Sequence, residues 1–387
     1  MDSINSLGYP LVYKAQHTGP WIDDLSDEGI AIRTEVRALD GMQKEALVYY
    51  TPTKTVWRMV SDEGPYLNGT DLSPFPLAFY TAGMAFSFVT ELLKHAASRA
   101  VDLSGIELIQ DNFYTMEGSA LRGDMTGGAL PAELAIKADL DNDQLQALVD
   151  KAVKSSPPQA YNRKVLDNIF SLTLNDESIP VTGIKASDKS KVDPGANFRL
   201  VGPESDTPRE DIIVKLRSAE TLFNVDGGAG SSLKSEQKRT LHVRGVVTVR
   251  KDGLLECNVQ LFKPIGSTFR FLCDYQDGDL APPPLAYLSA GVGFCFMTQV
   301  GRYATIVKQK IKAYRIVQDN TFTFDGNEAV AHPIDTHLFI DMNETTDEAQ
   351  KLLGMSEQTC FLHAAMRSEV PSNVGILTAD AISEAQA

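Results

Sequence analysis

The chain has 387 residues, of which 43% are hydrophobic and 22% charged, and its formal net charge is −15 at pH 7. This composition is typical of a soluble globular protein. The negative charge argues against a nucleic-acid ligand and against an anionic membrane surface, because both would repel the chain. The N-terminus lacks the basic region and apolar run of a secretory signal, so we expect a cytoplasmic location.

The N-terminal part of the sequence predicts strands, a long helix, further strands and a final helix. Asp40-Gly41 is a hairpin turn signal between two early strands. Pro76 suits the first turn of a helix, and an apolar run follows it. The triplet Gln110-Asp-Asn112 follows this helix and precedes a strand, where we expect it to form a turn or a helix cap.

The C-terminal part predicts the same order of elements. Residues Leu255–Leu261 alternate between apolar and polar side chains, as in a half-buried strand. From Leu285 to Met297 apolar and small residues occupy every side, which predicts a helix buried all round. Polar Gln299 and Arg302 interrupt this run before it reaches the length of a membrane span, so we expect no membrane insertion.

The last predicted helix begins after Thr359, whose hydroxyl can cap it. This start places Cys360 in the first helical turn. The free N–H groups and the helix dipole at that position favour a thiolate.

The sequence repeats itself. The segment PLAFYTAGMAFS at Pro76–Ser87 recurs as PLAYLSAGVGFC at Pro284–Cys295, 208 positions later, and the same offset pairs Gln110-Asp-Asn112 with Gln318-Asp-Asn320. Upstream the offset is 212, as between Asp62 and Asp274, which implies one short insertion in the first copy. We interpret the chain as a tandem duplication.

A repeat of about 170 residues is long enough for each copy to bury a core of its own. We expect one domain over residues 9–178 and a second over residues 209–378, hereafter the first half and the second half. Residues 179–208, rich in Ser, Asp, Lys, Pro and Gly, are the expected linker.

All four cysteines, Cys257, Cys273, Cys295 and Cys360, lie in the second half. They are too few for a disulfide scaffold and have no Cys-x-x-Cys spacing for zinc. We interpret Cys257 and Cys273 as core residues. The sequence carries no conventional metal or nucleotide signature, so we expect neither a metal nor a cofactor.

Two segments of the second half together resemble the OsmC/Ohr family (osmotically inducible protein C and organic hydroperoxide resistance protein). They are PLAYLSAGVGFCFMT at Pro284–Thr298 and CFLHAAM at Cys360–Met366. The resemblance implies an α+β fold in which antiparallel sheet surrounds a long buried central helix. Since members of this family are obligate dimers, two OsmC-like domains in one chain imply an intrachain pseudo-dimer, and further oligomerisation stays open.

The same resemblance implies a chemistry for two thiols. It makes Cys295 the nucleophile that attacks an organic hydroperoxide and Cys360 the thiol that resolves the sulfenic acid as a disulfide, which a dithiol such as a lipoylated protein then reduces. Ser87 and Ser156 occupy these positions in the first half, which we therefore expect to be catalytically silent.

The sequence departs from the family pattern at the helix start. Peroxide-reducing members place a glutamate directly after the helix-opening proline, whereas Leu285 and Leu77 stand there in this chain. Two other functions therefore stay open: a non-enzymatic binder of a hydrophobic ligand, and a thiol enzyme that acts on an electrophilic carbon or acyl group. Burial in the core is the alternative for both cysteines.

Overall fold

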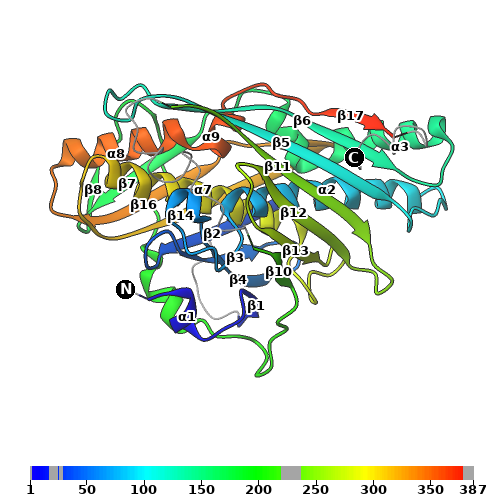
Figure 1. The fold of residues 1–387 in the computed structure, drawn as a ribbon, viewed down its shortest axis with the longest axis horizontal. Coiled ribbons are helices and arrows are strands. Elements are labelled where there is room, and N and C mark those ends of the chain that lie inside the picture. Colours follow the sequence, from blue (N-terminus) through cyan, green and yellow to red (C-terminus); the bar gives the residue numbers. More distant parts are fainter. Residues whose placement is uncertain (1, 17–24, 26–28, 219–236, 378–387) are drawn as a thin grey trace.

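The computed structural model describes residues 2–16, 25, 29–218 and 237–377, which form an α+β fold (Figure 1). The first half contains α1 (Ile4–Leu7), β1 (Val12–Ala15), β2 (Ile30–Ala38), β3 (Lys44–Tyr50), β4 (Thr55–Ser61), η1 (Pro65–Leu67), α2 (Pro76–Ala97), β5 (Glu107–Gly118), β6 (Thr126–Lys137), α3 (Asn142–Ser155), α4 (Pro157–Asn162), β7 (Ile169–Leu174) and β8 (Glu177–Ile179).

Residues 179–208 contain three short elements, β9 (Lys185–Ala186), η2 (Pro194–Ala196) and α5 (Asn197–Leu200). The second half contains β10 (Ile213–Arg217), β11 (Gln237–Val249), β12 (Leu255–Lys263), β13 (Thr268–Cys273), α7 (Pro284–Ile306), β14 (Ile311–Asp325), β15 (Glu328–Ala331), β16 (Asp335–Met342), α8 (Thr346–Thr359), α9 (Phe361–Met366) and β17 (Asn373–Ile376).

The strands form two sheets, and each sheet takes strands from both halves. One has the order β1-β4-β3-β2-β14-β16-β7-β8, with β15 on β14 and β9 on β7. The other has the order β10-β13-β12-β11-β5-β6-β17. At the seams β2 pairs with β14 and β11 pairs with β5, both antiparallel. One hydrophobic core therefore includes residues of both halves.

The two long helices α2 and α7 lie between the sheets, with β5 and β6 above them and β3 and β4 below in Figure 1. α2 packs on β11 and β12, α7 packs on β2 and β3, and the two helices pack on each other. They cross at glycines 208 positions apart: a Cβ at Gly83 would lie 2.4 Å from the backbone nitrogen of Leu288, and one at Gly291 would lie 2.5 Å from that of Tyr80. Only glycine permits this approach.

α2 is long and apolar enough to cross a membrane by length and composition, with a mean hydropathy of 1.2 over its most apolar window. However, 89% of that window is buried inside the protein. The apolar surface of α2 is therefore already covered by packing within the fold.

The expectation of a turn or cap at the Gln-Asp-Asn triplets is wrong, because both triplets lie inside strands, β5 and β14. Strand alternation turns the amides inward and the aspartate outward. Asn112 Nδ2 donates to Thr81 Oγ1 at 3.0 Å and Ser289 Oγ donates to Asn320 Oδ1 at 2.6 Å, which ties each strand to a central helix.

The aspartates of the two triplets join the halves. Arg33 of β2 donates to Asp319 of β14, and Arg244 of β11 donates to Asp111 of β5, each with a shortest contact of 2.8 Å. The first pair is buried, with side-chain exposures of 6% and 7%, whereas in the second pair Arg244 is 30% exposed. Equivalent strands thus carry equivalent ion pairs in unequal environments.

Candidate active site

The sulfurs of Cys295 and Cys360 lie 3.5 Å apart and share a hydrogen bond. Cys295 is on α7, 2% exposed, and Cys360 is fully buried between α8 and α9. Neither forms a disulfide. Since a disulfide has an S–S distance of about 2.05 Å, the sulfurs need to approach by only about 1.5 Å for the bond to form. Two residues that are 65 positions apart in sequence are therefore neighbours in the fold.

Cys360 lies one residue before the helix and not in its first turn, where the sequence predicts it. Thr359 is the last residue of α8 and its hydroxyl donates to the carbonyl of Met355, so it does not cap the next helix. Cys360 has extended dihedral angles, φ −72° and ψ 118°, and is the N-cap of α9. These angles end α8, while the carbonyl of Cys360 accepts the first hydrogen bond of α9, from Ala364.

The β6 strand fixes this junction from behind. A Cβ at Gly127 would lie 2.7 Å from the carbonyl oxygen of Thr359. The backbone that carries Cys360 therefore rests directly on the backbone of the first half.

The two thiols differ in acidity. Burial raises the pKa of the Cys295 thiol well above its usual range, and the neighbouring Cys360 and Glu63 raise it further. Burial also opposes ionisation of Cys360, but the hydrogen bond with Cys295 and the proximity of His363 outweigh it and hold the Cys360 pKa well below its usual range. Within the pair the negative charge is therefore favoured on Cys360.

His363 is three residues beyond Cys360 and fully buried. Its ring lies between Phe170 and Phe296, with centroids 5.3 Å from each. Neither ring nitrogen has a partner with hydrogen-bond geometry among the described residues, yet the ring is close enough to Cys360 to lower the pKa of that thiol. His363 is therefore a buried core residue whose ring lies beside the Cys360 thiol.

Polar side chains of the first half also approach Cys295. Glu63 follows β4 and is 3% exposed; its Oε1 accepts from Thr298 Oγ1 at 2.7 Å and its Oε2 accepts from Tyr66 at 3.2 Å. Lys44 of β3 is 1% exposed, and burial lowers its pKa although Glu63 raises it. The half without cysteines thus supplies a carboxylate, an ammonium and a phenol to the cysteine site.

Sequence reasoning missed Glu63, Lys44 and Tyr66. A signal for Glu63 and Tyr66 did exist, because the repeat offset changes between Asp62 and Pro74, and the inserted residues fall in the loop that carries both side chains. Asp62 closes this loop by accepting from the backbone N–H groups of Glu63, Thr70 and Leu72.

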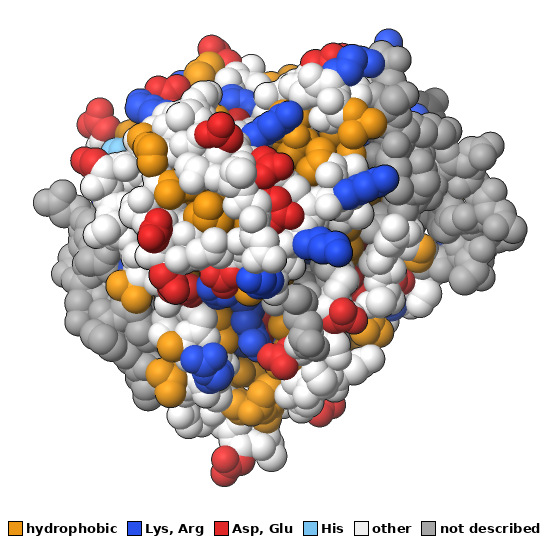
Figure 2. Space-filling view, turned by 90° about the vertical axis from the view of Figure 1, so that its left-hand side faces the viewer, with side chains coloured by type: hydrophobic (Ala, Val, Ile, Leu, Met, Phe, Trp, Pro, Cys, Tyr) orange, Lys and Arg blue, Asp and Glu red, His pale blue; other side chains and the backbone are white. Residues whose placement is uncertain are grey.

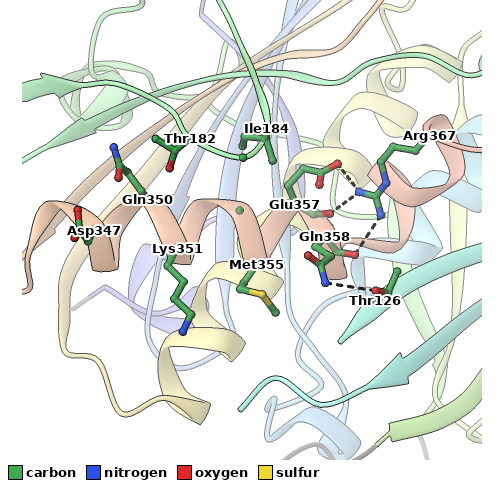
Figure 3. A pocket seen from close by; sticks show the side chains of 12 residues that line it. Thr126, Thr182, Ile184, Asp347, Gln350, Lys351, Met355, Glu357, Gln358 and Arg367 are labelled. Carbon is green, nitrogen blue, oxygen red and sulfur yellow. Dashed lines mark hydrogen bonds and ion pairs between the residues drawn. The ribbon is translucent and has the colours of Figure 1, made fainter. Parts of the chain in front are cut away.

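A groove of about 640 Å³ lies on the other side of the α8–α9 junction (Figure 3). Arg367 donates to the carbonyls of Glu357 and Gln358 and pairs with the Glu357 carboxylate, so it holds the last turn of α8 (Figure 3). The surface at this end of the molecule mixes acidic, basic and hydrophobic side chains (Figure 2).

The remaining candidate residues fall outside the site. Cys257 and Cys273 are fully buried on β12 and β13, and burial raises the pKa of each thiol. This environment agrees with the core role predicted for them. Ser87 and Ser156, which replace the cysteines in the first half, are 4% and 0% exposed.

Residues 276–375, which contain both Cys295 and Cys360, match the family model described as OsmC-like protein. The second half carries an OsmC-like domain. No curated protein sequence matches the chain.

Two solved structures are similar to parts of this chain. An OsmC-like hydroperoxide resistance protein from Jannaschia sp. CCS1 is 24% identical, with 31% of this chain and 79% of that chain covered and a TM-score of 0.20. An osmotic stress induced and detoxification response protein from Psychrobacter arcticus 273-4 is 14% identical, with 31% of this chain and 80% of that chain covered and a TM-score of 0.23.

Proposed function

We propose that this protein is a thiol-dependent peroxidase that reduces organic hydroperoxides with Cys295 and Cys360. The observation that carries the proposal is the 3.5 Å contact between two free thiols inside an OsmC-like domain. A buried pair at this distance, with one pKa lowered, is suited to a cycle between dithiol and disulfide.

The proposed cycle has three steps, which are attack on the peroxide, formation of the disulfide and reduction of the disulfide. A thiolate attacks the terminal oxygen of the hydroperoxide, the O–O bond breaks, and the alkoxide takes a proton and leaves as the alcohol. The attacking sulfur becomes a sulfenic acid. The second thiol attacks that sulfur, the S–S bond forms, and the hydroxyl leaves with a proton as water. A dithiol reductant, such as a lipoyl group, then exchanges with the disulfide and is itself oxidised.

The first attack is assigned to Cys295 by resemblance, whereas the charge of the pair is favoured on Cys360. These statements are compatible, because the two forms differ only by one proton moved across the hydrogen bond between the sulfurs. Glu63 and Lys44, both near Cys295, replace the missing helix-start glutamate in arranging charge around that sulfur.

We also propose that the two halves are OsmC-like units joined as an intrachain pseudo-dimer. Three features support this: the pairing of strands from the two halves at the β2–β14 and β11–β5 seams, the crossing of α2 and α7 at paired glycines, and the loop of the first half whose Glu63 accepts a hydrogen bond from Thr298 of α7. In this arrangement the first half is a scaffold for a single active site.

The experiment is consumption of cumene hydroperoxide with dihydrolipoamide, comparing the wild-type chain with Cys295→Ser, Cys360→Ser and, as a matched control, Cys257→Ser. We expect both site variants to lose steady-state turnover and the control to keep it. Intact-protein mass spectrometry after one equivalent of peroxide should show a disulfide between Cys295 and Cys360 in the wild type.

The single variants also identify the attacking sulfur. With a cyclic 1,3-diketone that traps sulfenic acids, Cys360→Ser should be labelled and Cys295→Ser should not. Labelling of Cys295→Ser instead would reverse the two roles. Absence of turnover in the wild type, with both thiols intact, would reject the peroxidase and favour a binding role or a different thiol reaction.

A further inference from the structure

The sulfur pair is closed to solvent in this structure. Cys295 is 2% exposed and Cys360 is fully buried. An external thiol must reach one sulfur of a disulfide in order to reduce it. A disulfide formed here therefore cannot be reduced until one of the two cysteines becomes exposed.

The surroundings of the two cysteines indicate which side opens. Cys295 lies within α7, a helix of 23 residues that packs on α2, β2 and β3. Cys360 is an extended residue between the end of α8 and the short helix α9. Such a junction opens at a lower free-energy cost than a central core helix. We therefore expect the chain to open at Cys360.

One side chain holds the last turn of α8 from outside. Arg367 donates to the carbonyl of Glu357 at 2.9 Å and to that of Gln358 at 3.2 Å, and it pairs with the Glu357 carboxylate. Carbonyls in the last turn of a helix lack the usual helical partners, and a basic side chain can replace them. Loss of the Arg367 contacts therefore loosens the turn that leads to Cys360.

The groove of about 640 Å³ lies beside this turn (Figure 3). Glu357, Gln358 and Arg367 line it together with Gly354 of α8. Nothing lies within 4 Å of a Cβ built at Gly354, so the groove is open above the helix backbone at that point. A space of this size is typical of sites that take small molecules. The residues that hold the turn thus also border a space that a ligand can enter.

The first half has a corresponding arginine. Arg163 stands 204 positions before Arg367 and donates to two carbonyls in the last turn of α3, at 3.0 and 3.1 Å. The two side chains are similarly exposed, 25% for Arg163 and 30% for Arg367. Helix capping therefore explains the arginine in both halves. Only the turn before Cys360 adds a carboxylate, because Val153 stands in α3 where Glu357 stands in α8.

We propose that the turn from Glu357 to Cys360 opens when Arg367 releases it, and that a dithiol reductant enters through the groove to reach Cys360. The need for a reductant rests on the proposed function, whereas the opening does not. One thiolate of the reductant attacks the Cys360 sulfur, the bond to Cys295 breaks, and Cys295 leaves and takes up a proton. The second thiol of the reductant then attacks the mixed disulfide, which releases Cys360 as a thiol and the reductant as a cyclic disulfide.

Labelling of the reduced chain with iodoacetamide tests the opening without turnover. Peptide mass spectrometry gives a rate for each cysteine, and Cys257, fully buried on β12, reports global unfolding. We expect Arg367→Met to raise the rate at Cys360 about 10-fold and to leave the rate at Cys257 unchanged. Arg163→Met, which removes the corresponding capping bonds in the first half, is the matched control and should leave Cys360 as slow as in the wild type.

Equal labelling of Cys360 in the wild type and Arg367→Met overturns the proposal. Parallel acceleration of Cys257 and Cys360 also overturns it, because the whole chain would then be unfolding. If Arg367→Met fails to fold, Glu357→Gln provides the comparison, since it removes the ion pair and keeps the carbonyl bonds. We expect a smaller acceleration at Cys360 in Glu357→Gln, and an unchanged rate there counts against the proposal.

Reduction of the disulfide tests the groove. The chain is oxidised with diamide, and its reduction by dihydrolipoamide is followed in the wild type, Arg367→Met and Gly354→Phe, with Gly354→Ala as the control for the change in α8. We expect faster reduction of Arg367→Met and several-fold slower reduction of Gly354→Phe, whose ring occupies the groove. Reduction of Gly354→Phe at the rate of Gly354→Ala overturns the groove as the route. If diamide forms no disulfide between Cys295 and Cys360, the proposed function fails, and the labelling test still decides the opening.

Discussion

The residues that follow Ser87 on α2 and Cys295 on α7 differ in burial and in hydrogen bonding. On α2, Thr90 donates to its own helix at Phe86, and Glu91 pairs at 2.9 Å with a Lys94 that is 61% exposed. The counterparts on α7 are Thr298, Gln299 and Arg302, all buried. The α2 set reaches the surface at Lys94, whereas all three α7 side chains are buried.

The loops of the opposite halves explain the difference. Asp62 and Asp274 stand at equivalent positions, and both close their loops by accepting several backbone N–H groups. The loop after Asp62 is longer and brings Glu63 to Thr298, whereas Tyr275 follows Asp274. The two loops therefore share a closing aspartate but differ in length and in the side chain that follows it.

The largest loss of stability should come from substitutions at the crossing of α2 and α7, where both helices carry a glycine. Gly291→Ala puts a methyl group 2.5 Å from the backbone of α2, and Gly83→Ala does the same against α7 at 2.4 Å. Since backbone must move, we expect each change to cost about 3 kcal/mol or more in the free energy of unfolding. Urea denaturation followed by circular dichroism measures both.

The control for this pair is Gly354→Ala in α8, where nothing lies within 4 Å of the new Cβ. There alanine should stabilise the chain by about 0.5–1 kcal/mol through its higher helix propensity. A stable Gly291→Ala together with an unstable Gly83→Ala would show that the two helices do not share one symmetric crossing.

The seam strands offer the next comparison, because Glu35 of β2 has the apolar Val246 as its counterpart on β11. Burial raises the pKa of Glu35 to about 7, although two hydrogen bonds from Asn197 of the linker oppose this. An acid with a raised pKa contributes stability at low pH that is lost as the pH rises through its folded pKa. The shift corresponds to about 3 kcal/mol.

Glu35→Gln should therefore weaken the dependence of the free energy of unfolding on pH. Between about pH 5 and pH 8 the wild type should lose about 3 kcal/mol relative to the variant, measured as the difference of two urea midpoints at each pH. The difference removes contributions from other titrating groups. Parallel curves for the two proteins would mean that Glu35 is ionised throughout and compensated by the linker.

Local sequence patterns were sufficient to predict the two central helices, because a helix buried on all sides has a pattern that is local in the sequence. The pairing of β2 with β14 was not predictable, since alternation along a strand indicates which face is buried but not which strand lies beside it. The Gln-Asp-Asn triplets show the same limit: their polar side chains suggested a turn because their partners, Arg33 and Arg244, come from the other half.

The site shows a second limit. Motif spacing selected Cys295 and Cys360 but could not give their 3.5 Å contact, which depends on how α7 meets the α8–α9 junction. Glu63 was not predictable as a site residue, because a buried carboxylate in an inserted loop has no periodic sequence pattern. Only the change of repeat offset marked it.

The smallest effect is expected from placing thiols in the first half. In a Cys295→Ser/Cys360→Ser background, Ser87→Cys and Ser156→Cys restore both sulfurs, and Ser156 already has φ −73° and ψ 118°, as Cys360 does at −72° and 118°. The position of His363 is nevertheless occupied by Gln159, and the position of Arg302 by the exposed Lys94. We expect cumene hydroperoxide consumption to stay at the level of the thiol-free background. Turnover close to that of the wild type would show instead that two neighbouring thiols are sufficient and that the interior around Cys295 is not needed for the chemistry.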